Sequence, residues 1–529
     1  MVSFSYLDST TFLPLLLATT MANPLHACLL LALLFVAVAF FRPGGVAWAL
    51  SGTHHGAAIP GPPGVLLAFA GPNPHRALAS VAASRGATRL MAFSVGLTRF
   101  VVAGHPDTAR EILTGAAFVD RPVKEAAAEL MFHRAMGFAP HGEYWRRLRR
   151  LASAHAFSPR RISGRLAECR RAIGEEMVRR VGLAMARDGV VGVRRLLHLA
   201  SLDNVMASVF GVSLGELGEG SVSELEKMVK EGYDLLGTFN WGDHVPLLRL
   251  LDVHGVRRRS RALASRVRVF VKNIIEEHRI RRREKNGGDN DDDDRDFVDV
   301  LLGLDGEERM EEDDMIAVLW EMIFRGTDTV AILLEWGLAR MALHPDVQDK
   351  AQAELDVAAA AADGDAAGLR YLHCVVKECL RMHPPGPLLS WARLATRDAH
   401  LDGGRALVPA GTTAVVNMWA IARDGGGLWR DGGEFRPERF LGEEAADVVS
   451  VTGCDLRLAP FGAGRRACPG RALAMATVHL WLAQLLRSFR WVPSDAGVDM
   501  SERLNMSLEM EKPLLCLALP RTSSVCTSI

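Results

Sequence analysis

FGAGRRACPG, residues 461–470, is the stretch of this chain that decides its fold. The apolar pattern from Ala472 to Phe489 that follows it predicts a buried helix. A glycine-rich loop therefore brings Cys468 to the start of a helix. A helix N-terminus and nearby arginines lower the pKa of a cysteine, and Pro469 stands where its missing N–H costs little. These features indicate a thiolate metal ligand, although a lone cysteine is more often a buried structural residue.

The same stretch contains the five fixed positions of FxxGxRxCxG. From background residue frequencies, this pattern arises by chance in a chain of this length with a probability on the order of 10⁻⁴. It resembles the haem loop of cytochromes P-450 at every fixed position. The resemblance implies that Cys468 is the axial iron ligand of a haem b cofactor, and that Arg466 pairs with a haem propionate. It also implies that Phe461 packs against the proximal side of the haem, and that the fold is the mainly α cytochrome P-450 fold with small β-sheets.

A second pattern lies inside a predicted helix from Glu311 to Leu343, which acidic residues open and His344-Pro345 close. Its middle reads RGTDTV, residues 325–330, and Gly326 there costs about 1 kcal/mol relative to alanine. By itself this favours a packing notch. It also resembles the P-450 pattern A/G-G-x-D/E-T-T/S, with Arg325 and Val330 as departures. The resemblance implies that Asp328 and Thr329 are catalytic and manage proton delivery during oxygen activation.

An ExxR pair, Glu378 and Arg381, falls in the predicted helix from Tyr371 to Met382. A solvated surface pair is the default interpretation of two such charges at i,i+3. The segment PERF, residues 437–440, follows and resembles the family segment whose arginine completes a Glu-Arg-Arg network behind the haem. By that resemblance Glu378, Arg381 and Arg439 are structural.

Further haem contacts are implied by the same family resemblance. Trp145 and Arg149 match WxxxR on a helix, and Arg393 follows His383-Pro384-Pro385. The resemblance assigns Trp145, Arg149 and Arg393 to the haem propionates. Taken alone, Trp145 and Arg149 indicate ordinary packing at i,i+4.

Charge and cysteine content exclude several classes of protein. Lys plus Arg equals Asp plus Glu, at 62 each, so no net charge attracts the chain to nucleic acid. The eight cysteines form no CxxC pair and are scattered along the chain, which argues against a zinc site or a disulfide framework. This distribution suits a reducing compartment.

Four regions are expected along the chain: a membrane anchor region at 1–42, a Pro/Gly hinge at 43–64, a catalytic domain at 65–520, and a tail at 521–529. Leu25 to Phe41 is almost continuously apolar and precedes the first basic residue, Arg42. The positive-inside rule therefore predicts a single-pass anchor with the catalytic domain in the cytosol. The resemblance to cytochromes P-450 implies that the membrane is that of the endoplasmic reticulum. The alternative is an interfacial or buried helix.

Outside the anchor, long helical patterns dominate. Short strands are predicted only near Met91 to Val102 and Thr412 to Val416. The stretches Asn286 to Asp296 and Ala358 to Gly368 are expected to be solvated loops. The fold class is therefore mainly α with small β-sheets.

Three further stretches resemble one plant P-450 subfamily, which is linked to leaf-initiation timing and organ size. They are residues 138–161, 324–336 and 505–514. The resemblance implies a monooxygenase that uses O₂ and receives NADPH-derived electrons from an NADPH-cytochrome reductase. A haem-thiolate isomerase or lyase, which needs no reductase, and a non-catalytic haem-binding membrane protein are the alternatives. The pair Asp328-Thr329 argues against the isomerase.

The substrate is expected to be small and apolar. By family resemblance, the cavity above the haem is lined by Met131, Phe132, Phe138, Trp320, Phe324, Leu388, Leu389, Trp391, Met506 and Leu508. Plain core packing suits any one of them as well. Arg325 is the strongly polar candidate and is able to hold a carboxylate if it faces the cavity. The hypothesis is therefore a medium- or long-chain fatty acid, or a compound derived from one, hydroxylated near its far end.

Overall fold

The computed structural model of the chain describes residue 28 and residues 40–51, 59–284, 295–360, 368–389, 392–424, 427–442 and 450–521. Most of the predicted anchor therefore lies outside the described residues. So do residues 286–294 of the acidic loop, 361–367 of the second loop, Trp391 and all but the first residue of the predicted tail.

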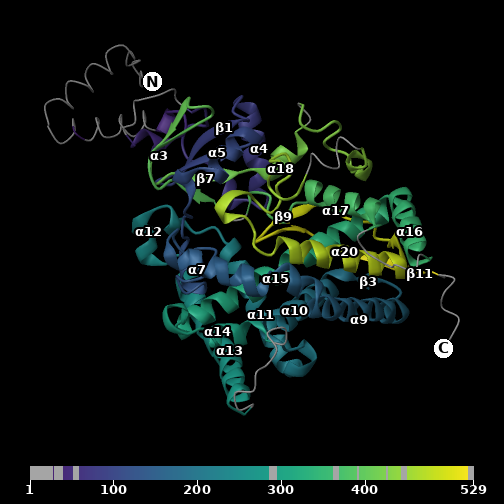
Figure 1. The fold of residues 1–529 in the computed structure, drawn as a ribbon. Coiled ribbons are helices and arrows are strands. Elements are labelled where there is room, and N and C mark those ends of the chain that lie inside the picture. The colour runs from purple at the N-terminus through teal and green to yellow at the C-terminus, as the bar shows by residue number, and fades with distance from the viewer. Residues whose placement is uncertain are drawn as a thin grey trace, which may run out of the picture.

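Helices make up most of the described chain, as predicted (Figure 1). Their bounds are α3 Val46–Ala49, α4 Pro74–Ser84, α5 Pro106–Thr114, α6 Glu125–Leu130, α7 Glu143–Leu151, α8 Pro159–Ser163, α9 Arg165–Asp188, α10 Val193–Phe210, α11 Leu214–Gly237, α12 Pro246–Leu251, α13 Val256–Glu284, α14 Phe297–Leu302, α15 Glu312–Leu343, α16 Pro345–Ala360, α17 Arg370–Met382, α18 Met418–Arg423 and α20 Arg471–Ser488.

The strands form small sheets, and the largest of them has the order β1-β2-β7-β4. β1 and β2 are an antiparallel hairpin, β7 pairs parallel to β2, and β4 pairs antiparallel to β7. The predicted strands near residues 91–102 and 412–416 are β1, β2 and β7. The strand bounds are β1 Leu90–Val95, β2 Thr98–Ala103, β3 Val191–Gly192, β4 Arg393–Leu394, β5 Ala399–Leu401, β6 Ala406–Val408, β7 Thr413–Val416, β8 Phe489–Pro493, β9 Glu502–Leu504, β10 Leu508–Met510 and β11 Leu515–Pro520.

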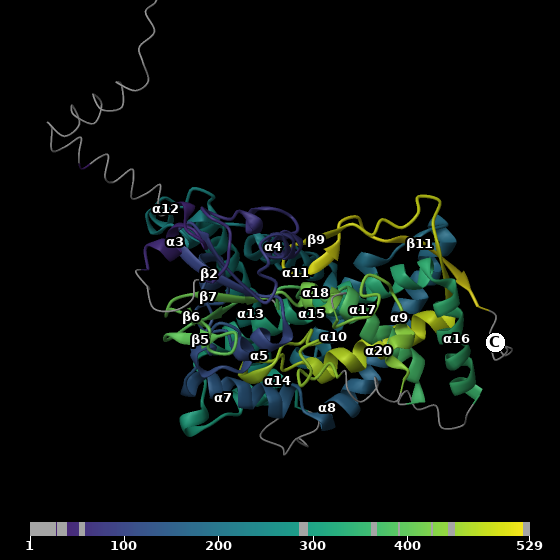
Figure 2. The same ribbon diagram turned by 90° about the horizontal axis from the view of Figure 1, so that it is seen from above.

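Helix α15 runs through the middle of the molecule, with α10, α17 and α20 around it in both views (Figures 1 and 2). Its bounds agree with the predicted helix to one residue, because Glu311 serves as N-cap and the chain leaves the helix at His344, before Pro345. A glutamate and two aspartates occupy its first turn, where they complement the helix dipole. Nearly every side chain from Met315 to Phe324 is buried, as expected for a helix that crosses a whole domain.

The Pro/Gly segment at 59–64 is non-helical, as predicted, and it lies against the edge of β1. Ala92 donates its N–H to the Pro60 carbonyl at 2.9 Å, and Gly64 donates to the Phe40 carbonyl at 2.6 Å. A Cβ atom on Gly61 would lie 1.8 Å from the Ala92 oxygen, so only glycine permits this approach. The segment thus fixes the first described residues to the β-rich end of the molecule.

Among the described residues, no single helix has both the length and the apolar composition to cross a bilayer. Among these residues, only α10 and α11 taken together are long and apolar enough, and they meet at a bend of 118°. Residues of both helices pack into one hydrophobic core with α13 and α15.

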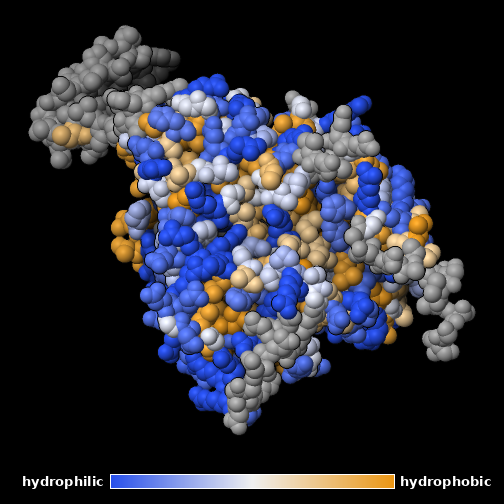
Figure 3. Space-filling view, viewed as in Figure 1, coloured by the Kyte–Doolittle hydropathy of each residue, from blue (hydrophilic) through white to orange (hydrophobic). Residues whose placement is uncertain are grey.

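One exposed apolar patch stands out at the β-rich end. Leu247, Leu250, Leu251 and Val253, on and just after α12, are each at least 65% exposed. Figure 3 shows hydrophobic surface over α12, and both ribbon views place α12 beside α3, near the start of the described chain (Figures 1 and 2).

Candidate active site

An internal cavity of about 280 Å³ lies between the middle of α15 and the loop that precedes α20. The sequence-predicted site residues come from four separate parts of the chain, and the structure brings all eight of them to this cavity. They are Trp145, Arg149, Asp328, Thr329, Arg393, Phe461, Arg466 and Cys468.

The Cys468 loop is held in place by its backbone. Cys468 donates its N–H to the Phe461 carbonyl at 2.9 Å, and Gly464 has a left-handed φ of +68°. A Cβ atom on Gly464 would lie 2.3 Å from the Leu113 oxygen, so a larger residue at this position would displace the loop from α5. The Cys468 side chain opens into the cavity, where it would hold the iron of a haem.

The electrostatics of the Cys468 thiol differ from the sequence-based expectation. Burial raises its pKa, and this effect outweighs the lowering by Arg325, by a hydrogen bond from the backbone of Gly470 and by Arg149. The expectation of a lowered pKa was wrong for the thiol itself, because the helix N-terminus lies in a desolvated environment. A coordinated metal ion deprotonates a thiol outright, so the raised pKa does not oppose iron ligation.

Four arginines gather at one side of the cavity: Arg121, Arg149, Arg393 and Arg466. Burial lowers the pKa of Arg393 to about 10, and the charge of Arg466 lowers it further. Arg393 Nη1 is buried and has no hydrogen-bond partner among the described residues. So many buried cations require an anionic partner. The two propionates of haem b would meet that requirement, and the Cys468 thiol, which would hold the iron, lines the same cavity.

The residues present therefore fit haem b, which would supply the redox chemistry of oxygen activation. Arg149, Arg393 and Arg466 would hold its carboxylates, and Cys468 its iron. The sequence analysis missed Arg121, because this residue lies in a loop beside Asp120 and belongs to no helical or strand-like pattern. The charges of Arg393, Arg325 and Arg466, added to burial, lower the pKa of Arg121.

Arg466 also ties the cysteine loop to a distant segment. Its guanidinium donates to the carbonyls of Val119 at 3.0 Å, Met136 at 3.3 Å and Ala139 at 2.7 Å, and lies 4.5 Å from the Trp145 ring centroid. Its Nη2 also lies 3.6 Å from Oδ1 of Asp120, so Arg466 already has one carboxylate partner within the protein. Its predicted role as a propionate partner stays a prediction.

Asp328 and Thr329 lie next to each other on α15, and both line the cavity. Burial raises the pKa of Asp328 to about 7, while a hydrogen bond with Ser507 lowers it. Asp328 therefore gains or loses a proton near neutral pH, which is the property that a proton donor needs. Of the two threonines next to Asp328, only Thr329 lines the cavity, because Thr327 is buried and donates its hydroxyl to the Ile323 carbonyl.

The two departures from the family pattern occupy different environments. Arg325 faces the cavity beside Glu321, one helical turn earlier, whose carboxylate accepts the Gly137 N–H at 2.8 Å. Val330 is buried but also lines the cavity, where it offers an apolar surface in place of a hydroxyl. Gly326 is needed for packing: a Cβ atom there would lie 2.6 Å from Cγ2 of Val205 on α10.

The Glu-Arg-Arg network is present and fully buried, so the default surface pair is excluded. Glu378 receives hydrogen bonds from Arg381 at 2.7 and 2.8 Å and from Arg439 at 3.0 Å. Arg381 also donates to the carbonyls of Ala422 and Gly432, each at 2.7 Å. Neither Glu378 nor Arg381 has an exposed side chain. The network joins α17 to the segments around α18.

The expected substrate-lining residues are only partly correct. Phe324, Leu389 and Met506 line the cavity, whereas Met131, Phe138, Trp320 and Leu508 are buried core residues away from it. Phe132 and Leu388 lie outside the lining, and Trp391 outside the described residues. The sequence analysis missed a set of apolar lining residues: Val205, Val209, Val318, Met322, Val330 and Leu333.

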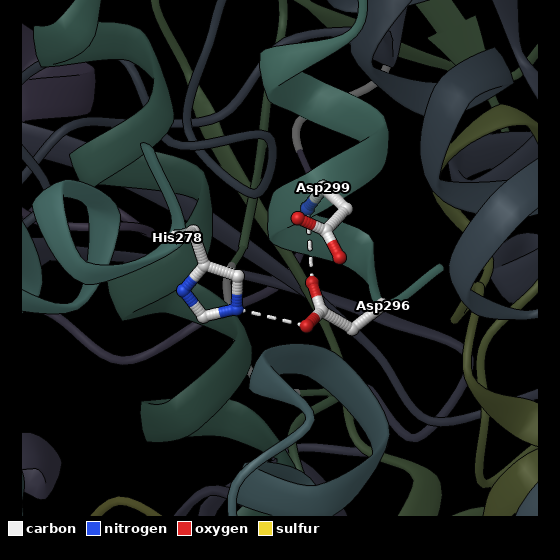
Figure 4. A group of neighbouring side chains, drawn as sticks. All are labelled: His278, Asp296 and Asp299. Atoms are coloured by element: carbon white, nitrogen blue, oxygen red, sulfur yellow. Dashed lines mark hydrogen bonds and ion pairs between the residues drawn. The ribbon is translucent and has the colours of Figure 1, made fainter. Parts of the chain in front are cut away.

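A histidine and two aspartates form a separate cluster of possible metal ligands, His278, Asp296 and Asp299 (Figure 4). Asp296 accepts the Asp299 N–H at 2.9 Å as the N-cap of α14 and bonds His278 Nε2 at 2.8 Å. Burial opposes protonation of His278, but the bond and charge of Asp296 outweigh it and raise the pKa of His278. The cluster is thus a helix cap that joins α13 to α14.

Comparison with known proteins agrees with this site. The family model "Cytochrome P450" matches residues 63–517. Cytochrome P450 78A5 of Arabidopsis thaliana is 53% identical over 500 residues, covering 93% of this chain and 94% of that protein. Cytochrome P450 78A1 of Zea mays is 52% identical, covering 83% and 81%. Dimethylnonatriene synthase of Zea mays is 36% identical, covering 85% and 87%.

Half-identical relatives from plants span nearly the whole chain, and Cys468, the buried arginines and the pair Asp328-Thr329 share one cavity. The chain therefore belongs to the cytochrome P450 family of haem-thiolate monooxygenases.

Proposed function

We propose that this monooxygenase hydroxylates a medium- or long-chain fatty acid, or a growth regulator derived from one. The apolar wall that faces Asp328 and Thr329 is the observation that supports this. It consists of side chains from α10, α15 and the segment around Met506. A mainly aliphatic cavity binds a chain by burying methylene groups, at about 0.8 kcal/mol each. Four or five methylenes therefore support millimolar binding before association costs.

Arg325 is the proposed anchor for a carboxylate head group. It faces the cavity, but Glu321 lies beside it, so a substrate carboxylate competes with an internal one. Arg325 is therefore expected to contribute less than an unopposed arginine. A relative named for the synthesis of dimethylnonatriene, an acyclic hydrocarbon, is consistent with an aliphatic cavity.

Spectral titration tests the substrate class. Fatty acids of increasing chain length should shift the haem from low to high spin with affinity that rises with length. Arg325→Ala should weaken binding of the acids but not of the matching alcohols. Arg147→Ala is the matched control, since this exposed arginine bonds the Glu307 carbonyl at 2.8 Å. A shift by compact ring-shaped hormones and by no fatty acid would contradict the proposal.

The redox partner is proposed to be an NADPH-cytochrome reductase. Members of the family use haem b and electrons that a reductase supplies, and the intact acid-alcohol pair supports oxygen activation. Product formation should require both NADPH and the reductase. A product that forms from a hydroperoxide without either of them would instead indicate an isomerase.

The proposed location is the cytosolic face of the endoplasmic reticulum membrane. Two features support it: the apolar run Leu25 to Phe41, followed at once by Arg42, and the α12 patch at the same end of the molecule. Because α12 presents leucines that are exposed among the described residues, it is proposed to dip into the lipid beside the anchor. Protease added to intact microsomes should digest the catalytic domain. Its protection would place the domain in the lumen.

A further inference from the structure

Behind the cavity, a histidine faces the catalytic aspartate from another helix. His198 Nε2 on α10 lies 3.8 Å from Asp328 Oδ1 on α15. Asp328 lines the cavity, whereas His198 does not. Asp328 therefore lies between His198 and the cavity. His198 Nε2 is buried and has no hydrogen-bond partner among the described residues. The resemblance to the family assigned no role to this side chain.

The ring of His198 also reaches accessible space. Its side chain is 27% exposed, and Arg195, three residues earlier and on the same side of α10, is 78% exposed. We infer that His198 is a positioning residue that supplies protons to Asp328 from the α10 side of the protein. The cavity would then receive protons without opening to solvent at the substrate.

The proton transfer balances in three steps. The imidazolium of His198 gives its Nε2 proton to the Asp328 carboxylate and becomes neutral imidazole. Asp328, now a neutral acid, donates that proton into the cavity and returns to carboxylate. Solvent then reprotonates His198. A gap of 3.8 Å is closed by a small rotation of either side chain or by one bridging water.

The energetics of the two groups favour this direction. Burial lowers the pKa of His198 below 6.5, although the nearby carboxylate of Glu335 opposes the effect. Burial raises the pKa of Asp328 to about 7. A proton therefore passes from the weaker base, His198, to the stronger one, Asp328.

The charges around the pair are arranged in neighbouring ion pairs. Arg194, on α10, bonds Glu335 of α15 at 2.8 Å and lies 3.6 Å from Glu509 of β10. From α11, Glu226 pairs with Arg195 at 3.3 Å. These two arginines and three glutamates leave one net negative charge around His198, and the Asp328 carboxylate is the one that lies within 4.0 Å of its Nε2 among the described residues.

The pH profile of coupling tests this role. His198→Gln keeps an N–H donor but does not titrate, so product formed per NADPH should fall on the order of tenfold at the acid end of the profile, where His198 is most protonated. The inflection that His198 contributes below pH 6.5 should also disappear, while the inflection of Asp328 near pH 7 should remain. His244→Gln is the matched control, a part-buried histidine that contacts Thr98 at 3.1 Å. Asp328→Asn with His198→Gln should be no worse than Asp328→Asn alone, because both act on one path.

A second measurement does not depend on turnover. The pKa of His198 in the haem-loaded protein can be followed by NMR of labelled histidine rings, assigned by the signal lost in His198→Gln. Removing the Asp328 charge in Asp328→Asn should lower that pKa. If His198→Gln fails to fold, the pH profile of His198→Asn and the His198 pKa measured in Asp328→Asn test the proposal instead. An unchanged His198 pKa, or an unchanged pH profile in His198→Gln, would overturn the proposal.

Discussion

Cys468 carries the iron in this assignment, and it is the only cysteine that lines the cavity among the described residues. Replacing its sulfur with oxygen removes the thiolate with little change in volume. Cys468→Ser should therefore abolish the reduced carbon-monoxide Soret band of haem-thiolate proteins. Cys454→Ser, at an exposed thiol, should keep it. If Cys468→Ser retains the band, Cys468 is not the ligand.

Thr329 contributes a hydroxyl to the cavity wall and little to the core. Thr329→Ala should keep the haem spectrum while electrons from NADPH are diverted from product to peroxide, by about 10²-fold if the hydroxyl acts in proton transfer. Peroxide release and product yield measure this directly. Thr327→Ala is the control, because its hydroxyl donates to the Ile323 carbonyl at 2.7 Å and is buried. Unchanged coupling in Thr329→Ala would reduce Thr329 to a packing role.

Asp328 should make stability depend on pH. Its pKa is raised from 3.8 to about 7 in the folded protein, so the native state binds more protons between these values. The free energy of unfolding then falls as pH rises from about 4 to about 7, by up to about 4 kcal/mol. Asp328→Asn removes this cost and should raise the thermal unfolding temperature at pH 8 more than at pH 5. Asp495→Asn, at an exposed carboxylate, should show no such difference.

At the scale of secondary structure, one buried ion pair on α17 can be compared with an exposed one on α9. Glu378→Ala leaves Arg381 and Arg439 without their carboxylate in the core, which should cost about 3–5 kcal/mol and prevent stable haem incorporation. Glu176 also pairs with an arginine at i,i+3, but in solvent. Glu176→Ala should change stability by less than about 1 kcal/mol. Similar losses in denaturant unfolding would contradict the assigned role of Glu378.

Helix α15 shows how much the sequence predicts. Acidic residues and a following proline set its ends within one residue, because these signals are local. Which face meets the cavity depends on the neighbouring helices. Val318, Met322, Thr329 and Leu333 share one stripe, whereas Trp320 and Phe324 lie one turn apart on another side, and of these two only Phe324 lines the cavity. A substrate role for Trp320 was therefore wrong, although the helix itself was correctly predicted.

Contacts between elements are likewise predictable from the sequence only where a local pattern of residues marks them. The fixed spacing around Cys468 and within ExxR allowed their partners to be predicted, and the structure joins Glu378, Arg381 and Arg439 as expected. Neither Val205 against Gly326 nor Ser507 beside Asp328 has any such spacing, since each pair joins segments more than 100 residues apart. Only packing of the whole domain brings them together.

At the scale of the whole molecule, the anchor and the catalytic body should be separable. Deleting residues 1–42 removes the apolar run but no residue that lines the cavity. The truncated protein should keep its reduced carbon-monoxide band and bind vesicles more weakly in flotation. Deleting residues 1–39 instead keeps Phe40, whose carbonyl accepts the Gly64 N–H, and gives the matched control for local damage. Loss of haem in both truncations would mean that the segment belongs to the core.

The three carbonyls that bind Arg466 have a further consequence, for how substrate preference can diverge among related proteins. Each acceptor is a main-chain oxygen, at Val119, Met136 and Ala139, and every amino acid carries one. Side chains between residues 119 and 139, apart from Asp120, which pairs with Arg466, and Arg121, which lines the cavity, can therefore be exchanged without breaking the link to the cysteine loop. New substrate pockets can arise there by mutation while the iron site keeps its geometry, so selection can act on the two parts separately.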